Sequence, residues 1–181
     1  LSMSSEREKP EKAGEDEYEK VQRELAHIDI YRDTPIRYLG YANEVGESFR
    51  SLVPVTFVRL SYVAAFGYVC ADAFDKSRKE FRKSWPSESS RQKAAAIAAG
   101  DTFLWQTLAS VAIPGFTINR ICHFTGKLLT RTGWLPPTVR KWTTTAVGLA
   151  AIPFIVHPID SAVEIGMNKT VRPLYQQQQQ S

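Results

Sequence analysis

The chain has 181 residues, of which 43% are hydrophobic and 23% charged, and its formal net charge is +4. This length is enough for one compact domain and too short for two of ordinary size. Residues 1–47 carry 7 basic and 12 acidic side chains, a net charge of −5, so residues 48–181 carry +9. Because the basic residues flank apolar stretches and form no separate stripe, we expect no nucleic-acid partner and favour lipid headgroups.

Residues 1–30 form a polar leader. Ser, Glu, Lys, Pro and Gly dominate residues 1–17 without apolar periodicity, which predicts disorder. Apolar residues then recur at helical spacing through residues 18–28, which predicts a short amphipathic helix that ends before Pro35. The leader lacks the apolar core of a secretory signal and is too acidic for an Arg-rich transit peptide, so we expect any organellar targeting to be internal.

Three apolar stretches follow the leader, at residues 52–74, 94–118 and 142–163. A helix rises ~1.5 Å per residue, so about 23 residues cover roughly 34 Å, against a hydrocarbon core of ~30 Å. Each stretch is therefore long enough to cross a bilayer. We predict an all-α fold, a small multi-pass membrane bundle over residues 31–175 with about three long apolar helices and short amphipathic helices, followed by a disordered Gln-rich tail at 176–181.

Local signals in and beside these stretches predict how the helices begin, bend and pack. Ser51 is placed to cap the first helix. Pro114 and Pro153 predict kinks, because proline removes a backbone N–H and clashes with the preceding turn. Gly67 and Gly100, each four residues from an alanine, predict close approach of helix backbones.

Charged residues interrupt the apolar stretches, with Arg59 in the first, Asp101 in the second and Asp160 in the third. A charge near the bilayer centre costs about 2.5–3.5 kcal/mol on insertion scales, so these candidate intramembrane polar residues need partners. Two interpretations stay open. The residues either make structural contacts, such as an Arg59–Asp101 ion pair, or line a transport pathway.

Basic residues gather in both connectors between the stretches. The second connector, residues 119–141, contains no acidic residue, and its basic residues are the candidate lipid contacts: Arg120, Lys127, Arg131, Arg140 and Lys141. Each Lys or Arg beside an anionic lipid surface contributes about 1 kcal/mol. Gly133 and Pro137 predict a helix break within this connector, and a shorter helix around 117–131 is an alternative. With three crossings the two basic connectors lie on opposite sides, so either the positive-inside rule gives no orientation or one apolar stretch does not fully cross.

Motifs for catalysis and cofactor binding are missing from the sequence. The glycines at 40 and 46 have the wrong spacing for a phosphate-binding loop, and no Lys-Ser or Lys-Thr pair follows them. The histidines His27, His123 and His157 lie in separate segments without Cys or carboxylate neighbours at ligand spacing. We therefore expect no enzymatic activity, no metal and no cofactor.

Several longer strings carry a family resemblance. They occur in this order: RYLGYANEVGESFRSLVP at 37–54, DTFLWQ at 101–106, SVAIPGFTINR at 110–120, RKWTTTAVGL at 140–149 and HPID at 157–160. Together they closely resemble the mitochondrial fission process protein family. The resemblance implies a multi-pass protein of the inner mitochondrial membrane that promotes mitochondrial division and supports inner-membrane integrity.

From this resemblance we expect a non-enzymatic scaffold or regulator. Its expected partners are inner-membrane proteins of unknown identity and the lipids of the inner mitochondrial membrane, with cardiolipin as the candidate lipid. The alternative function is a small transporter or channel whose pathway uses Arg59, Asp101 and Asp160. Reconstituted flux in liposomes distinguishes the two.

Overall fold

The computed structural model describes residues 31, 35–133 and 135–179. Contacts divide the chain into two units, residues 1–37 and 38–181. The features discussed below belong to the second unit. The disorder and the amphipathic helix predicted within residues 1–30 lie outside the described residues and stay predictions.

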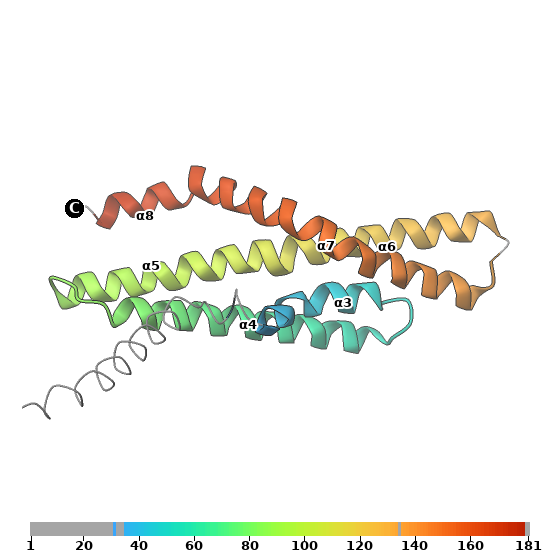
Figure 1. Cartoon of the computed structure of the whole chain (residues 1–181), viewed down its shortest axis with the longest axis horizontal. Helices are drawn as coiled ribbons and strands as arrows, with labels where there is room; N and C mark the ends of the chain where they lie inside the picture. The colour runs from blue at the N-terminus through green and yellow to red at the C-terminus, as the bar shows by residue number, and fades with distance from the viewer. Residues whose placement is uncertain (1–30, 32–34, 134, 180–181) are drawn as a thin grey trace, which may run out of the picture. The chain divides into compact units, whose positions relative to one another are not determined.

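Every regular element in the described part of the chain is helical, which confirms the all-α fold (Figure 1). The elements in order are a 3₁₀ helix η1 (Pro35–Tyr41), α3 (Ala42–Ser48), α4 (Val55–Phe81), α5 (Glu88–Gln106), a π-helix η2 (Thr107–Ala112), α6 (Ile113–Thr132), α7 (Pro137–Lys169) and α8 (Arg172–Gln179). Three helical segments are long and apolar enough to cross a membrane: Val55–Phe81, Glu88–Thr132 and Pro137–Tyr175. The predicted stretches at 94–118 and 142–163 each fall within one of them, and the first stretch does so apart from residues 52–54.

The helices of the second unit pack antiparallel in chain order (Figure 1). The α5 helix returns along α4, η2 and α6 continue in the direction of α5, and α7 returns along α6. The short α3 lies against α4, α6 and α7. A seven-residue helix is thereby held by all three long segments.

Capping residues and breakers set most helix ends. Ser87 caps α5 by accepting a hydrogen bond from the Ser90 backbone N–H at 3.1 Å. Gly133, with φ +70°, ends α6 in the left-handed conformation that glycine tolerates best, and α7 begins at Pro137. The predicted cap Ser51 is wrong, because Pro54 occupies the N-cap of α4, and the Ser51 hydroxyl donates instead to the Lys141 carbonyl at 3.4 Å.

The predicted bend near Pro114 takes the form of the π-helix η2. Proline has no N–H to donate to the carbonyl four residues earlier, and its ring crowds that carbonyl, so a wider turn just before it relieves the clash. The shorter helix offered as an alternative around 117–131 corresponds to α6, which continues from α5 through η2 without a break in the helical backbone. The continuous helix of 45 residues is about 67 Å long, roughly twice the hydrocarbon thickness.

The chain continues as helix into the predicted tail. The α8 backbone runs to Gln179 and so includes residues 176–179, which the sequence analysis assigned to a disordered tail. Consecutive glutamines have good intrinsic helix propensity. Residues 180 and 181 lie outside the described range.

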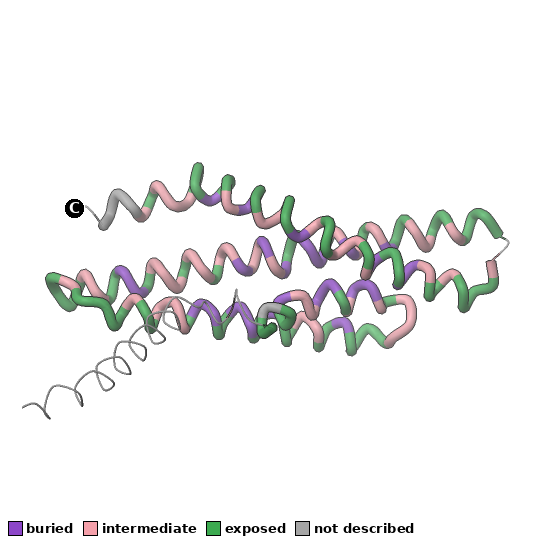
Figure 2. Tube along the Cα trace, viewed as in Figure 1, coloured by how far each residue is buried: buried purple, intermediate pink, exposed green. Residues whose placement is uncertain are grey.

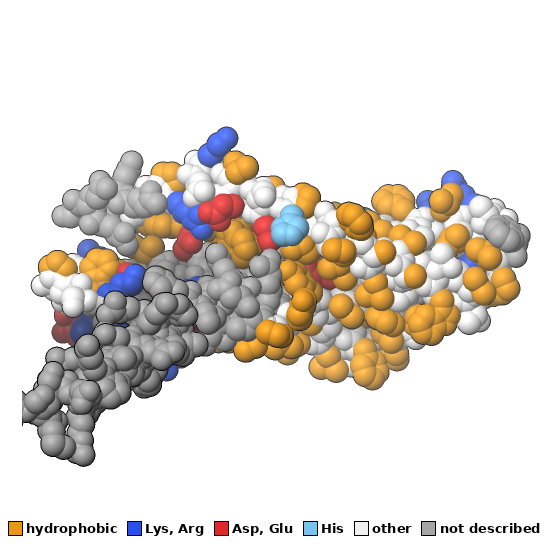
Figure 3. Space-filling model, in the orientation of Figure 1, with side chains coloured by type: hydrophobic (Ala, Val, Ile, Leu, Met, Phe, Trp, Pro, Cys, Tyr) orange, Lys and Arg blue, Asp and Glu red, His pale blue; other side chains and the backbone are white. Residues whose placement is uncertain are grey.

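Small side chains form much of the helix-helix core. Ala65 and Ala73 on α4 and Ala94 and Ala95 on α5 are buried, and buried positions follow the facing sides of the helices (Figure 2). Many large hydrophobic side chains of the long helices are exposed instead, and orange patches are spread over the end of the molecule formed by α6 and α7 in Figure 3. This outward distribution suits helices that face lipid.

Glycine lets neighbouring helices approach closely, but at positions other than the predicted Gly67 and Gly100. A Cβ atom added at Gly67 or Gly100 would meet nothing within 4 Å, so the packing role predicted for these two is wrong. A Cβ at Gly148 on α7 would lie 2.6 Å from Cys122 Sγ and 2.8 Å from Ser48 Oγ. Gly148 therefore lets α7 approach α3 and α6 together.

Candidate functional site

The α3 helix buries a polar face. Its buried residues Asn43, Glu44, Glu47 and Ser48 are each at most 2% exposed, and they are related by the three- and four-residue steps that share a helix face. Buried polar groups need hydrogen-bond partners, since an unpaired one costs free energy. Partners for Asn43 and Glu47 come from η2, α4 and α6.

Glu47 is the best connected of these residues. Arg50 donates to its carboxylate through Nε at 2.6 Å and Nη2 at 2.5 Å. The Tyr62 hydroxyl on α4 donates at 3.0 Å, and Asn119 Nδ2 on α6 donates at 2.8 Å. Burial alone would raise the pKa of Glu47, but these donors outweigh it and hold the pKa below its ordinary value. One carboxylate thus ties α3 to two of the long segments.

Glu44 is also buried, but its pKa is raised, whereas that of Glu47 is lowered. Its side chain is 0% exposed, and neither carboxyl oxygen has a hydrogen-bond partner. Burial raises the pKa of Glu44 to about 8, and the negative charge of Asp160 on α7 raises it further against the effect of the Glu44 backbone. At neutral pH the Glu44 carboxyl is therefore mostly protonated. Asp160, predicted as an intramembrane polar residue, lies close enough to Glu44 to influence its ionisation.

A second buried polar contact joins α4 to α5. Gln106 Nε2 donates to Asp72 Oδ2 at 2.6 Å, and the Ser110 hydroxyl donates to Gln106 Oε1 at 2.6 Å. Asp72 is 0% exposed, with Lys76 Nζ at 3.9 Å. Our sequence analysis missed Asp72, although it lies inside the first predicted stretch. A carboxylate inside a membrane-spanning stretch is costly and therefore indicates a paired or functional residue.

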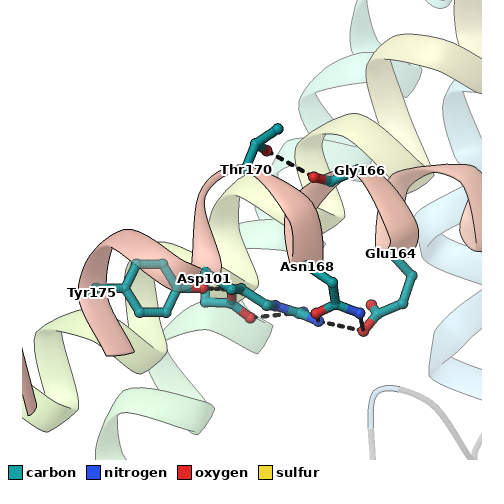
Figure 4. A network of polar contacts seen from close by, with 7 residues as sticks. Asp101, Glu164, Gly166, Asn168, Thr170 and Tyr175 are labelled. Atoms are coloured by element: carbon teal, nitrogen blue, oxygen red, sulfur yellow. Dashed lines mark hydrogen bonds and ion pairs between the residues drawn. The ribbon is translucent and has the colours of Figure 1, made fainter. Parts of the chain in front are cut away.

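Asp101, predicted to lie in the second span, pairs with Arg172 at the start of α8 (Figure 4). Arg172 Nε and Nη2 donate to its two carboxylate oxygens at 2.9 and 3.0 Å, and the Tyr175 hydroxyl donates to the same carboxylate. Arg172 Nη1 also donates to Glu164 and, at 2.7 Å, to Asn168. This network fastens α8 to α5 and to the end of α7.

The three candidate intramembrane residues do not come together. Arg59 is exposed on α4 and lies about 20 Å along that helix from Asp72. Asp72 contacts Gln106, and Asp101 lies further still along the antiparallel α5. The predicted Arg59–Asp101 pair is therefore replaced by Asp101–Arg172, while the charge of Asp160 acts on Glu44. No spacing rule points to Arg172, which is 71 positions from Asp101.

A basic pocket lies where α6 and α7 meet the end of α3. Its volume is about 490 Å³, and none of its lining residues is acidic. The lining contains Ser48, Arg50, Ser51, Asn119, Cys122, His123, Gly126, Lys127, Thr130, Pro137, Arg140, Lys141 and Thr144. Three of the five predicted lipid contacts, Lys127, Arg140 and Lys141, therefore line one cavity together with Arg50 and His123, which our sequence analysis did not assign to lipid.

The two other predicted lipid contacts lie outside this pocket. Arg120 and Arg131 are exposed on α6, and neither belongs to the pocket lining. The Arg120 guanidinium lies over the Phe116 ring, 5.0 Å from its centroid. The basic connector thus divides into a group that faces the cavity and a group that does not.

The described residues contain no group of three or more His, Cys, Asp or Glu side chains that could hold a metal ion. Cys70 and Cys122 are free thiols, the first exposed and the second buried. What the described arrangement offers is buried polar contacts between helices and a concave cluster of positive charge. Such features serve helix assembly and anion binding.

Comparisons with known proteins agree with one another. The family described as Mitochondrial 18 KDa protein (MTP18) matches residues 26–167. The chain is 59% identical over 152 residues to "Mitochondrial fission process protein 1" of Caenorhabditis elegans, covering 84% of this chain and 92% of the relative. The protein of that name from Homo sapiens is 56% identical over 151 residues, covering 83% and 90%, and that of Danio rerio is 54% identical over 148 residues, covering 82% and 89%. No solved structure matches.

Proposed function

The chain belongs to the mitochondrial 18 kDa protein family, and from this membership we propose that it acts in mitochondrial fission as a multi-pass protein of the inner mitochondrial membrane. The observation that carries the proposal is the identity of 54–61% to relatives named for the mitochondrial fission process, over most of both chains. The family match at residues 26–167 covers α3 through α6 and nearly all of α7.

Three features support a membrane location. Three helical segments are long and apolar enough to cross a bilayer, and large hydrophobic side chains are exposed along them. Two carboxylates that would be costly in lipid, Glu47 and Asp72, are buried against other helices. An inward polar face with an outward apolar face is the arrangement that a bilayer requires.

We place the protein among non-enzymatic scaffolds or regulators. The sequence lacks a phosphate-binding loop, so this chain has no evident means of using nucleotide hydrolysis to drive scission. The proposed mode of action is contact, with inner-membrane proteins of unknown identity and with anionic lipids such as cardiolipin through the basic connector. The basic pocket and the exposed Arg120 and Arg131 supply the positive charge for the lipid contacts.

Location is tested first, by carbonate extraction of isolated mitochondria and by protease protection after osmotic swelling. We expect the protein in the membrane pellet, and we expect protection until the outer membrane is ruptured. Release into the supernatant, or digestion in intact mitochondria, would exclude an integral inner-membrane location.

Function is tested by depletion and re-expression with mitochondrial length as the measurement. Depletion should lengthen the mitochondrial network, and the wild-type chain should restore it. An unchanged network after complete depletion would remove the fission role, whatever the location.

A further inference from the structure

The basic pocket has the composition of an anion site. Lys127 on α6 and Arg140 and Lys141 on α7 come from two antiparallel helices and converge on one cavity with no acidic residue in its lining. The volume of about 490 Å³ is within the range of ~300–1,000 Å³ typical of small-molecule sites. Hydroxyl and amide groups of Thr130, Thr144 and Asn119 add polar lining.

The positive charge of this pocket is not neutralised within the described chain. Arg50 is paired with Glu47, whereas the other ion pairs of the described residues involve neither Lys127 nor Arg140 nor Lys141. Three like charges around one cavity repel one another, and an anion placed among them removes that repulsion. The cavity therefore favours a negatively charged occupant.

The pocket lies at the level where the apolar stretches stop. The second stretch ends at residue 118, just before Asn119, and the third begins at residue 142, just after Lys141. Arg50 lies five positions before the first residue of α4. Lipid headgroups occupy this level of a bilayer, outside the hydrocarbon core.

Exposed hydrophobic side chains adjoin the basic ones. Leu128, next to Lys127, is 63% exposed, and Trp142, next to Lys141, is 57% exposed. Figure 3 shows basic and hydrophobic side chains side by side at the α6–α7 end. A soluble anion gains no stabilising contact from hydrophobic side chains, whereas the acyl chains of a phospholipid can pack on them while its phosphate contacts the basic residues.

We propose that this pocket binds the phosphate of one anionic phospholipid, with Lys127, Arg140 and Lys141 around the headgroup and the acyl chains along the apolar surface beside Leu128 and Trp142. The proposal rests on the proposed function only for the presence of a membrane. It is narrower than a general attraction of the connector to lipid, because it excludes Arg120 and Arg131 from the site.

The test is native mass spectrometry of the full chain in detergent micelles with dioleoylphosphatidylglycerol added in steps. We expect one tightly bound lipid per chain and much weaker binding of dioleoylphosphatidylcholine. Each basic residue near an anionic lipid contributes a factor of about five, so K127Q/R140Q should weaken binding about 25-fold. The matched control R120Q/R131Q removes the same charge from outside the pocket and should bind like the wild type.

Three results would overturn the proposal. Equal weakening by R120Q/R131Q would mean a diffuse basic surface, and equal binding of dioleoylphosphatidylcholine would mean an acyl-chain groove. Displacement of the lipid by inorganic phosphate alone would mean a site for a soluble anion. None of these results bears on mitochondrial length, so failure of the pocket is distinguishable from failure of the fission role.

Two further variants keep the test decisive if K127Q/R140Q does not fold, as judged by its circular dichroism. The charge-conserving variant K127R/R140K should retain lipid binding, which separates charge from packing. The single variant Lys141→Gln alters an exposed side chain and should weaken binding about fivefold. Unchanged affinity in Lys141→Gln would contradict the placement of this residue at the headgroup.

Discussion

Gly148 is the point where one added methyl group tests the helix packing most sharply. In Gly148→Ala the new Cβ would lie 2.6 Å from Cys122 Sγ and 2.8 Å from Ser48 Oγ, where ordinary contacts of a Cβ are 3.4–4 Å. Ser48 is not free to turn aside at no cost, because its hydroxyl donates to the Glu44 carbonyl at 2.9 Å. The methyl group should therefore push α7 away from α3 and α6.

The expected loss in the free energy of unfolding of Gly148→Ala is estimated by comparison with Gly67→Ala. That variant places a methyl group in open space on α4. Replacing glycine by alanine within a helix stabilises it by about 1 kcal/mol, and this gain is common to both variants. Overpacking costs about 1–3 kcal/mol and applies only to Gly148→Ala. The free energy of unfolding of Gly148→Ala should therefore be about 1–3 kcal/mol below that of Gly67→Ala.

The assay is unfolding by sodium dodecyl sulfate in mixed micelles, followed by circular dichroism. In a Cys122→Ala background the cost of Gly148→Ala should fall, because the nearest clashing atom is gone. Equal free energies of unfolding for the two glycine variants would refute this account of α3, α6 and α7 packing.

Three further predictions concern Glu44, Asp101 and the contact between Gln106 and Asp72. Because the pKa of Glu44 is raised to about 8, the protein should lose stability, by up to roughly 5 kcal/mol, as pH rises from about 4.5 to 8. Glu44→Gln should flatten this dependence when the free energy of unfolding is measured across that pH range. An unchanged slope in Glu44→Gln would contradict the burial of Glu44. Asp101→Asn should weaken the contact of Arg172 and increase hydrogen exchange throughout α8, at a cost of about 1–3 kcal/mol, and unaltered exchange would exclude the ion pair as the anchor of α8. Gln106→Leu removes a donor from buried Asp72 and should lower the free energy of unfolding by about 1–3 kcal/mol, whereas a neutral result would mean that this contact is not formed.

The pairing of charges illustrates where reasoning from sequence succeeded and where it failed. The sequence singled out Asp101 because a carboxylate in an apolar stretch needs a partner, and in the structure it has one in Arg172. Its partner Arg172 was not found, because it lies beyond the apolar stretches on a different helix. Sequence shows which charges need partners, but partner choice depends on which helix faces meet.

The lipid candidates show the same division. The sequence has five basic residues and no acidic ones between residues 119 and 141, which made the five the candidate lipid contacts. It could not separate Lys127, Arg140 and Lys141, which line a cavity, from Arg120 and Arg131, which do not. Along a helix, a difference of a few positions turns a side chain toward or away from a neighbour.

By itself the sequence determined the helical class, the three long apolar segments and the break between α6 and α7, because helix length, apolar content and the effects of glycine and proline are local properties of the chain. Only the tertiary structure decided that α3 buries its carboxylates among three helices, that Gly148 and not Gly67 is the close contact, and that Asp101 pairs with Arg172. These outcomes depend on the rotation and register of each helix against its neighbours. Rotation and register are fixed by packing between residues far apart in sequence, which no local pattern encodes.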